Sequence, residues 1–503
     1  MKTLAYYDMT GIQNFIFLSK KMRENIGASS IVSKLFSNEN LKSLGVTEID
    51  LDKGFESDSK EGKIIFSGGG NLLLMFNDKE SAINFTKKLS KNFYDYTYGL
   101  VSFAVSYKET NLQDYQKDFD ELIKQANIRK NKLPKKTSLL GISITRESFL
   151  DNLPAYYKDE DGYISKPAYL MRREEEINIF EEKFKEVLDG LTFEKNIEKF
   201  RGKEDGHLAY IHIDGNSMGN FIKGILQNSK DFKDSIRLIK KISFDINKIY
   251  EKAFSETLKK MKNKKHFIAN NKIKIRPIIF GGDDITLICE GKYGLSIAED
   301  ILKNIEQERI KIDGKELTLT ASAGVALVKA HFPFYRGYEL AEELCKSAKE
   351  KGKRISSYYK LNYIGSWIDF HIVFSGITTD LKTLRNKIYS VPNMQKPEPK
   401  EGYDSYNLLW RPYYIGGEKI LEKFNFNNLK KLVNDFNNKP KNKIKKLRSY
   451  LIKSKEDVEF YINFLNSRNF CLPTYDNSNK IFTEEKITPY YDAIEIMEFL
   501  ENI

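Results

Sequence analysis

Three carboxylates near the middle of the chain have the type and spacing that metal-dependent phosphoryl chemistry needs. Asp214 ends an apolar run, and about 70 residues later the turn Gly281-Gly282-Asp283-Asp284 lies between two more apolar runs. In nucleotidyl transfer a ribose oxygen attacks an α-phosphate while pyrophosphate leaves, and two divalent cations roughly 3.5–4 Å apart assist both events. Mg²⁺ takes oxygen ligands and commonly one or two carboxylates from a protein. The sequence therefore predicts that Asp214, Asp283 and Asp284 are catalytic residues and metal ligands.

The same residues also have plain structural explanations, and these stay open. A Gly-Gly hairpin can carry two exposed acids, and an Asp before a Gly/Asn/Ser turn often only caps that turn. The joint pattern favours chemistry, because a palm-type nucleotidyltransferase needs one acid at a strand end and others at the tip of the adjacent hairpin. Glycines suit such a site, since phosphates approach most closely where no Cβ obstructs them. We therefore predict that nucleotide is bound by Gly215, Asn216, Ser217, Gly281 and Gly282.

A lysine is predicted to complete this site. Residues 339–352 carry apolar side chains at helical spacing, and Gly352 is a natural helix end. Lys349 would then lie near the basic end of that helix, with Lys353 or Arg354, where it could reach triphosphate oxygens. Compensation of the helix dipole explains such basic residues equally well, so both interpretations stay open.

The elements that must position these residues occur twice in the same order. The first copy has a strand ending at Asp8, a helix, a hairpin with the turn Gly68-Gly69-Gly70-Asn71, a helix and a strand. The second has a strand ending at Asp214, a helix, a long basic helical insertion, the hairpin with the turn 281–284, a helix and a strand. This order describes a split βαβ, ferredoxin-like sheet. We predict an α/β (α+β) fold with two palms in tandem; two unrelated α/β domains are the alternative.

The first copy lacks the paired carboxylates. Its turn ends in Asn71, and Asp8 alone would make a poor Mg²⁺ site. A glycine-lined turn can still admit a nucleotide, so this half is predicted to hold substrate or to be purely structural. The candidate nucleotide-binding residues are Ser67, Gly68, Gly69, Gly70 and Asn71.

The chain of 503 residues is long enough for several domains. We predict a first palm over residues 1–150, a charged helical connector over 151–206, a second palm over 207–357, and a mainly helical C-terminal domain over 358–503.

Charge and cysteine content limit the possible partners and compartment. The net charge is +12, with basic runs at 124–136, 259–276 and 439–455 that suit RNA or polyphosphates, although each could be a solvated surface. Only three cysteines occur, Cys289, Cys345 and Cys471, too far apart for a disulfide framework or a CxxC zinc ribbon. No signal peptide or bilayer-length apolar run is evident, so we expect a cytoplasmic protein.

These motifs resemble a known family, the Cas-ten family of large polymerase-like subunits in type III CRISPR effector complexes. Its first palm opens with an Asp-x-[Ser/Thr]-Gly-Ile-Gln-x-Phe-Ile pattern, which is similar to residues 8–16, and carries a metal-free GGN turn, similar to 69–71. Its second palm carries an Asp-x-[Asp]-Asn-[Leu/Met]-Gly motif, which is similar to residues 214–219, and the GGDD turn. The resemblance covers roughly residues 1–360; the C-terminal part is similar only in kind.

The resemblance implies nucleotidyl cyclase or GGDEF-like palms that use ATP and Mg²⁺ or Mn²⁺ to make cyclic oligoadenylate or a related second messenger in antiviral defence. It implies guide or target RNA and other CRISPR effector subunits as possible partners. By position, Asp214, Asp283 and Asp284 match the family's metal ligands, and Lys349 matches a phosphate contact.

Three departures from the family mark a reduced version. No His-Asp pair of an HD nuclease occurs, the four-cysteine zinc insertion is absent, and Asn216 replaces the second acid of the first motif. The chain could be a compact effector subunit or a stand-alone signalling synthase. The alternative function is an RNA- or protein-binding scaffold with little or no catalysis. Base preference, ring size, activating signal and oligomeric state stay open.

Overall fold

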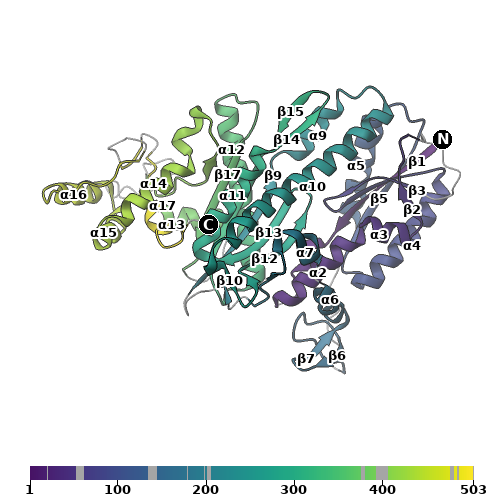
Figure 1. The fold of residues 1–503 in the computed structure, drawn as a ribbon, viewed down its shortest axis with the longest axis horizontal. Coiled ribbons are helices and arrows are strands. Elements are labelled where there is room, and N and C mark those ends of the chain that lie inside the picture. The colour runs from purple at the N-terminus through teal and green to yellow at the C-terminus, as the bar shows by residue number, and fades with distance from the viewer. Residues whose placement is uncertain are drawn as a thin grey trace.

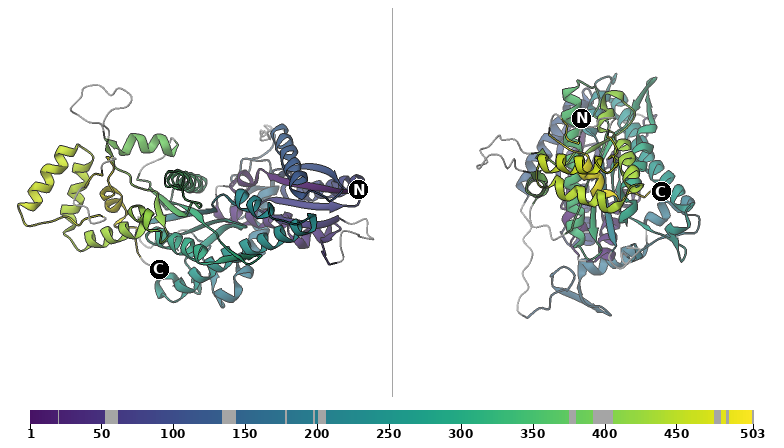
Figure 2. Two further views of the ribbon diagram at one scale, coloured as in Figure 1. Left: turned by 90° about the horizontal axis from the view of Figure 1, so that it is seen from above. Right: turned by 90° about the vertical axis from the view of Figure 1, so that its left-hand side faces the viewer.

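Two sheets and a helical end follow one another along an elongated molecule. The computed structural model describes residues 1–19, 21–52, 62–133, 144–177, 179–196, 199–200, 206–374, 380–391, 406–475, 481–483 and 486–501. The first sheet lies at one end, and α14 (Phe426–Asn437), α15 (Lys441–Leu451) and α16 (Lys455–Asn466) lie at the other (Figures 1 and 2). Within these described ranges, no helix combines the length and the apolar character needed to cross a membrane.

The first sheet has five strands in the order β2-β3-β4-β1-β5. β1 lies between β4 and β5, and a run of buried residues fills most of its length. The strands are β1 (Lys2–Thr10), β2 (Val46–Glu48), β3 (Gly62–Gly68), β4 (Asn71–Phe76) and β5 (Ser102–Thr110), and the helices are α1 (Ile12–Ile16), α2 (Met22–Leu35), α3 (Asn38–Ser43), α4 (Lys79–Thr97) and α5 (Tyr115–Lys132).

The second sheet has six strands in the order β12-β13-β9-β16-β17-β20. Its strands are β9 (His207–Gly215), β12 (Ile275–Gly281), β13 (Asp284–Glu290), β16 (Ala321–Lys329), β17 (Ser366–Ile372) and β20 (Tyr413–Ile415), and its helices are α9 (Met218–Leu226), α10 (Phe232–Lys262), α11 (Gly294–Gln307) and α12 (Phe334–Tyr358). β17 and β20 come from the segment predicted as a helical C-terminal domain, so the sheet continues past residue 357. The predicted domain division itself stays a prediction.

Helices cover both faces of the second sheet, and two glycines mark the contacts. A Cβ at Gly324 of β16 would overlap the carbonyl oxygen of Ala341, so α12 packs directly on this face. A Cβ at Gly294 would overlap the Cβ of Ala209, which places α11 on the other face. Because both faces are covered, β16 is buried along nearly its whole length.

The two sheets repeat one another residue by residue around the predicted turns. Asp8 pairs with Asn71 in the first sheet, and Asp214 pairs with Asp284 in the second. Each hairpin also has a register shift at the same place, around the residue three positions before its first turn glycine. The prediction of two ferredoxin-like palms in tandem is confirmed.

The palms contact each other through the end of α1, through α12 and through their hairpin turns. The rings of Phe17 and Tyr338 stack with centroids 4.0 Å apart, and the Gln13 amide donates to the Tyr338 hydroxyl at 3.0 Å. A Cβ built on Gly282 would lie 3.9 Å from the backbone nitrogen of Gly69. The two turns therefore face each other across the contact.

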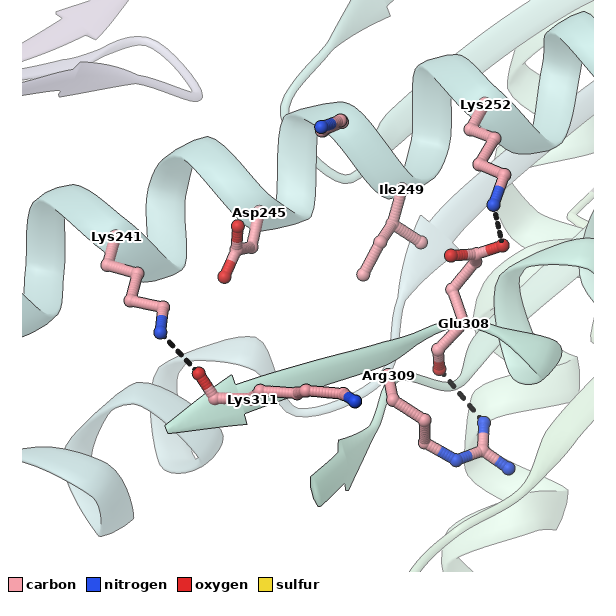
Figure 3. Close-up of a pocket in the computed structure, with 8 residues that line it drawn as sticks. Lys241, Asp245, Ile249, Lys252, Glu308, Arg309 and Lys311 are labelled. Atoms are coloured by element: carbon pink, nitrogen blue, oxygen red, sulfur yellow. Dashed lines mark hydrogen bonds and ion pairs between the residues drawn. The ribbon is translucent and has the colours of Figure 1, made fainter. Parts of the chain in front are cut away.

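Two small hairpins extend from this frame. β6 (Ala155–Asp159) and β7 (Gly162–Ser165) form a hairpin in the segment predicted as a helical connector, next to α6 (Lys166–Ile177), α7 (Ile179–Lys183) and α8 (Lys185–Leu188). The sequence predicts the helices but not this hairpin, since its outer residues are exposed and show no alternation. β14 (Arg309–Ile312) and β15 (Lys315–Thr318) form the second hairpin, which lies beside α10 with a groove between them (Figure 3).

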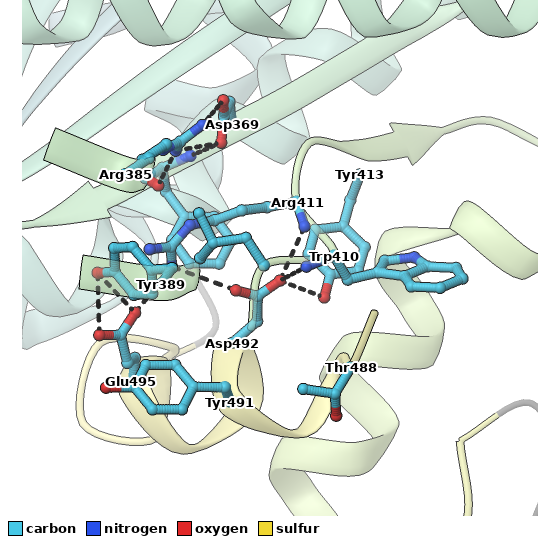
Figure 4. A network of polar contacts seen from close by, with 12 residues as sticks. Asp369, Arg385, Tyr389, Trp410, Arg411, Tyr413, Thr488, Tyr491, Asp492 and Glu495 are labelled. Atoms are coloured by element: carbon cyan, nitrogen blue, oxygen red, sulfur yellow. Dashed lines mark hydrogen bonds and ion pairs between the residues drawn. The ribbon is translucent and has the colours of Figure 1, made fainter. Parts of the chain in front are cut away.

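A buried ionic network ties the C-terminal helices to the second sheet (Figure 4). Asp492 of α17 (Tyr490–Ile496) accepts hydrogen bonds from the backbone nitrogens of Trp410 and Arg411 at 3.0 and 2.8 Å and from the Tyr413 hydroxyl at 2.9 Å. The Arg411 guanidinium is fully buried and lies 3.0 Å from Glu495. Since an unpaired buried charge is strongly destabilising, this network holds the segment before β20 against α17.

We predict that Asp492→Ala destabilises the protein by roughly 3–5 kcal/mol, because Arg411 and two backbone N–H groups lose a buried acceptor. Urea unfolding followed by tryptophan fluorescence measures this change, since Trp410 lies in the network. Glu498→Ala is the matched control: Glu498 pairs with Lys445 at 3.1 Å, but both side chains are about two-thirds exposed, and such a pair contributes less than ~1 kcal/mol. Equal effects of the two substitutions would contradict the assigned role of the network.

Candidate nucleotidyl-transfer site

The second sheet brings two of the three predicted acids together by register. Asp284 begins β13 and lies directly opposite Asp214 near the end of β9. Directly paired residues on adjacent antiparallel strands have Cβ atoms roughly 4.5–5.5 Å apart on the same face. The apolar residues that precede Asp214 and follow Asp284 are buried on both faces, which fixes this register. The carboxylates therefore stand side by side where the buried strands meet solvent.

Asp283 reaches the same place from the hairpin turn. A Cβ at Gly215 would lie 2.6 Å from Asp283 Oδ2, so the close approach of this carboxylate to β9 depends on that glycine. Gly282, at the preceding turn position, has φ +64°, which glycine adopts without strain. Two of the glycines predicted from sequence, Gly215 and Gly282, thus have geometric reasons in the turn itself.

The electrostatics of the three acids are unfavourable without a cation. Burial and the charge of Asp214 raise the pKa of Asp283, and burial with the charges of Asp214 and Asp283 raises the pKa of Asp284 well above its usual value. Asp284 Oδ1 accepts no hydrogen bond from any described residue. The His212 Nδ1 atom lies 3.4 Å away but also lies 2.9 Å from the Thr286 hydroxyl, and burial lowers the pKa of this imidazole.

Lys349 of α12 supplies the positive charge at this site. Its ammonium donates to Asp214 Oδ2 and to the Gly215 carbonyl oxygen, the latter at 2.7 Å. Lys349 therefore lies beside the acids, and its predicted contact with triphosphate oxygens stays a prediction. The predicted helix end at Gly352 is wrong, because α12 continues to Tyr358. A Cβ at Gly352 would lie 2.7 Å from Trp367 Cδ1, so this glycine permits helix–sheet packing rather than a helix stop.

The first palm has the same frame with different chemistry. Asp8 stands opposite Asn71, and the Lys130 ammonium of α5 lies 2.8 Å from Asp8, as Lys349 lies beside Asp214. The Asn71 side chain accepts a hydrogen bond from the Tyr6 hydroxyl at 2.7 Å. Sequence reasoning missed Lys130; the only signal was its equivalent place on the helix that follows the last strand of the palm.

The serine predicted to bind nucleotide in the first palm is already engaged by the protein. The Ser67 hydroxyl donates to the Phe36 carbonyl oxygen at 2.7 Å. Gly69 and Gly70, with φ +58° and +77°, form the turn that glycine adopts without strain. Nucleotide binding by residues 67–71 stays a prediction.

A cavity of about 420 Å³ opens beside the turn that follows Asp214. The turn residues Asn216 and Ser217 line it, together with Asn220 and Phe221 of α9, residues 318–320, and Ser356 and residues 361–364. The Asn216 amide donates to the Gly365 carbonyl at 2.8 Å and accepts from the Ser322 hydroxyl at 2.9 Å. The Asn216 side chain is thus already hydrogen-bonded within the protein, and its contact with nucleotide stays a prediction. Sequence reasoning missed the residues around Tyr363, which come from a loop without a recognisable motif.

The acids of this site have the chemistry of a divalent cation site, although their carboxylate groups are not close enough together to hold one metal ion. Among the described residues, no three Asp, Glu, His or Cys side chains are gathered closely enough to hold a metal ion. The raised pKa values and the unpartnered Asp284 oxygen show that this place favours a positive charge. Oxygen donors of this kind suit Mg²⁺ or Mn²⁺.

Comparison with known proteins agrees with this geometry. Residues 207–356 match the protein family described as Cas10/Cmr2, second palm domain. The second palm is therefore similar to a Cas10/Cmr2 palm. The match contains the strand-end acid, the GGDD turn and Lys349, and it confirms the resemblance to the Cas-ten family. No curated protein matches the chain in sequence.

Solved structures that contain Csm1 have the same fold over almost the whole chain. A Csm1–Csm4 cassette in complex with cA4 is 12% identical with a TM-score of 0.54, and the apo cassette is 14% identical with a TM-score of 0.53. Csm1 of T. onnurineus is 14% identical with a TM-score of 0.50. Each match covers 99% of this chain and 70% of the other chain. At such identities the likeness establishes the fold, which extends beyond the Cas10/Cmr2 palm itself.

We predict that Asp284→Asn raises the midpoint of thermal unfolding at pH 7 in EDTA. The pKa of Asp284 is higher in the folded protein than in the unfolded chain, so the ionised carboxylate lowers stability as pH rises above about 4. The gain should be roughly 1 °C for each kcal/mol recovered in a chain of 503 residues that unfolds as one unit, and it should vanish as pH falls toward 4. Differential scanning fluorimetry across this pH range measures it.

The matched control is Asn71→Asp, which adds the missing carboxylate at the equivalent position of the first palm. It should lower the midpoint at pH 7, because it places a second acid opposite Asp8. A loss of stability in Asp284→Asn that is equal at every pH would show that charge repulsion is not the controlling factor.

Proposed function

We propose that the protein is a nucleotidyltransferase that uses ATP and Mg²⁺ or Mn²⁺ to make cyclic oligoadenylate or a related cyclic nucleotide for antiviral, type III CRISPR-like signalling. The observation that carries the proposal is the cross-strand pair of Asp214 and Asp284 with Lys349 beside it. The Cas10/Cmr2 match supports the reaction class, and a relative with the same fold was solved in complex with cA4.

In the proposed reaction a new bond forms between a ribose oxygen and the α-phosphorus of ATP, the attacking hydroxyl loses its proton, and the bond to pyrophosphate breaks. Asp214, Asp283 and Asp284 would hold the divalent cations, which supply charge neutralisation and activation of the attacking oxygen. Lys349 would exchange its contact with Asp214 for triphosphate oxygens. Gly281 and Gly282 leave room for those phosphates, and the turn after Asp214 borders the cavity where the remainder of the nucleotide would lie.

The first palm would hold the second nucleotide. Its turn faces the GGDD turn at Gly69 and Gly282, so a nucleotide on each turn would place an acceptor beside a donor. With Asn71 in place of the second acid, this half would bind substrate without holding a catalytic metal. Partner subunits of an effector complex, as in the Csm1–Csm4 cassettes, and guide or target RNA are the proposed macromolecular partners.

A weakly catalytic or non-catalytic scaffold is the second candidate function. The absence of a converged three-ligand cluster in the described residues favours it, as do the basic runs along the chain. Metal binding separates the two functions, because a scaffold has no need for the carboxylates to take up a cation.

We predict that Mn²⁺ raises the unfolding midpoint of the wild type and of Asp8→Asn but not of Asp284→Asn or Asp214→Asn. With ATP and Mn²⁺, the last two variants should release pyrophosphate about 100-fold more slowly, since even residues that only orient metal ligands affect activity 10–100-fold. Asp8→Asn is the matched control, because Asp8 is the strand-end acid of the palm that lacks the second carboxylate. Equal stabilisation of all four proteins by Mn²⁺ would refute the assigned metal site.

We further predict opposite effects of Lys349→Met on the two ligands. Removal of the ammonium frees Asp214, so Mn²⁺ should bind more tightly, whereas ATP should bind more weakly, by about tenfold, through the loss of one charge-assisted contact. Electron paramagnetic resonance of free Mn²⁺ and fluorescence of an ATP analogue measure the two affinities. A parallel loss of both would place Lys349 in the structural frame instead.

A further inference from the structure

A basic groove lies on the side of the second palm away from the carboxylates. His212 pairs with Gly324, whose face of the sheet is covered by α12, and Asp214 and Asp284 share that face. α10 packs with α11 on the opposite side, within the other hydrophobic core. The groove runs along the outer surface of α10, opposite β14, with a volume of about 400 Å³ (Figure 3). It is lined by Lys241, Asp245, Lys248, Ile249, Lys252, Glu308, Arg309 and Lys311.

The basic side chains stand in two rows because of local periodicity. On α10, Lys241, Lys248 and Lys252 recur on one helical stripe, and on β14 the exposed Arg309 and Lys311 alternate with buried residues. The helical row spans about 16 Å at a rise of 1.5 Å per residue. The basic side chains of α10 and those of β14 therefore face each other across the groove.

Part of this charge is not neutralised by the protein. Lys252 pairs with Glu308 at 2.6 Å and Lys311 with Glu316 at 3.1 Å. Lys241 donates to the Lys311 carbonyl oxygen, so its charge has no acid opposite it there. Within the described residues, Lys248 has no carboxylate partner. Five basic and two acidic side chains line the groove, so it attracts an anion.

An exposed aromatic ring stands on the rim of this groove. Phe244 is 64% exposed, and on α10 it lies about one helical turn from Lys241 and from Lys248. The Lys248 ammonium is 5.9 Å from the centroid of the ring. Single exposed apolar residues are ordinary, but an aromatic ring beside phosphate-binding charges is the combination on which unpaired bases stack.

We propose that the groove between α10 and β14 binds a single-stranded nucleic acid. The two basic rows contact successive phosphates, and Phe244 stacks on an unpaired base. Asp245 lies among the lysines without a hydrogen-bond or ion-pair partner in the described part of the chain. A carboxylate disfavours a bare inorganic anion at this place, but it accepts hydrogen bonds from the sugar hydroxyls or base amino groups of a nucleic acid. The groove is a site separate from the carboxylates, and the inference does not rest on the proposed reaction.

The test measures binding of a fluorescent 12-nucleotide single-stranded RNA to the full chain between 50 and 200 mM salt by anisotropy. Lys248→Glu/Arg309→Glu should weaken binding at least tenfold and reduce the slope of log K against log salt by about 2. The matched control is Lys87→Glu/Lys88→Glu, the same charge change at two exposed residues of α4. Phe244→Ala should weaken binding about tenfold with the salt slope unchanged, because stacking carries no counterion release.

Equal losses in the two double variants would overturn the proposal, since the groove would then act only as general surface charge. An unchanged affinity in Phe244→Ala would overturn the stacking assignment. Competition by free ATP as effective as by the RNA, at equal phosphate concentration, would indicate a small-anion site and also overturn it. Mn²⁺ stabilisation should be the same in the groove variants as in the wild type, so failure here is distinguishable from failure of the metal site.

Discussion

Repulsion among three neighbouring carboxylates is the constraint on which the chemistry of the second-palm site depends. Asp214 and Asp284 are held side by side by strand register, and Asp283 approaches them over Gly215. Burial, and after it the charge of the neighbouring acids, raises the pKa values of Asp283 and Asp284. Sheets covered on both faces by helices resist the relaxation that would separate the acids. Lys349, from a helix packed tightly on β16, offsets part of the repulsion.

The first palm shows that the frame exists without the repulsion. It keeps the strand-end acid, the turn, the register shift in the hairpin and a lysine on the following helix, as the pairs Asp8–Lys130 and Asp214–Lys349 illustrate. Only the second acid is replaced, by Asn71, whose amide oxygen accepts from Tyr6. One hydrogen bond from a hydroxyl is enough for a neutral amide oxygen, whereas a carboxylate in the same place is stabilised by a cation. The palm fold thus fixes where these side chains lie. Whether the site can hold a cation depends on one residue, which is Asn71 in the first palm and Asp284 in the second.

Local patterns sufficed to predict the tandem palms and the placement of Asp214, Asp283 and Asp284, because short segments of sequence determine strand ends and glycine turns. They also predicted that Lys349 lies on a helix, but not where that helix ends. The residues that sequence reasoning missed come from elsewhere. Lys130 acts through a contact 122 residues away in the chain, and the walls of the cavity near Tyr363 come from an irregular loop. Gly352 was misread because packing against a tryptophan and a helix end both select glycine. β17 and β20 join the second sheet across a long separation that periodicity does not encode.

The contact between Lys349 and Asp214 links the two ligands of the proposed reaction. One carboxylate cannot be fully available to a cation while an ammonium occupies its oxygen, so metal and lysine compete for Asp214. A triphosphate offers Lys349 alternative oxygens of higher charge. Nucleotide binding would therefore release Asp214 and favour metal binding, and by linkage the metal would favour the nucleotide equally. Such coupling would make the carboxylates bind the metal more tightly when the nucleotide is present than when it is absent.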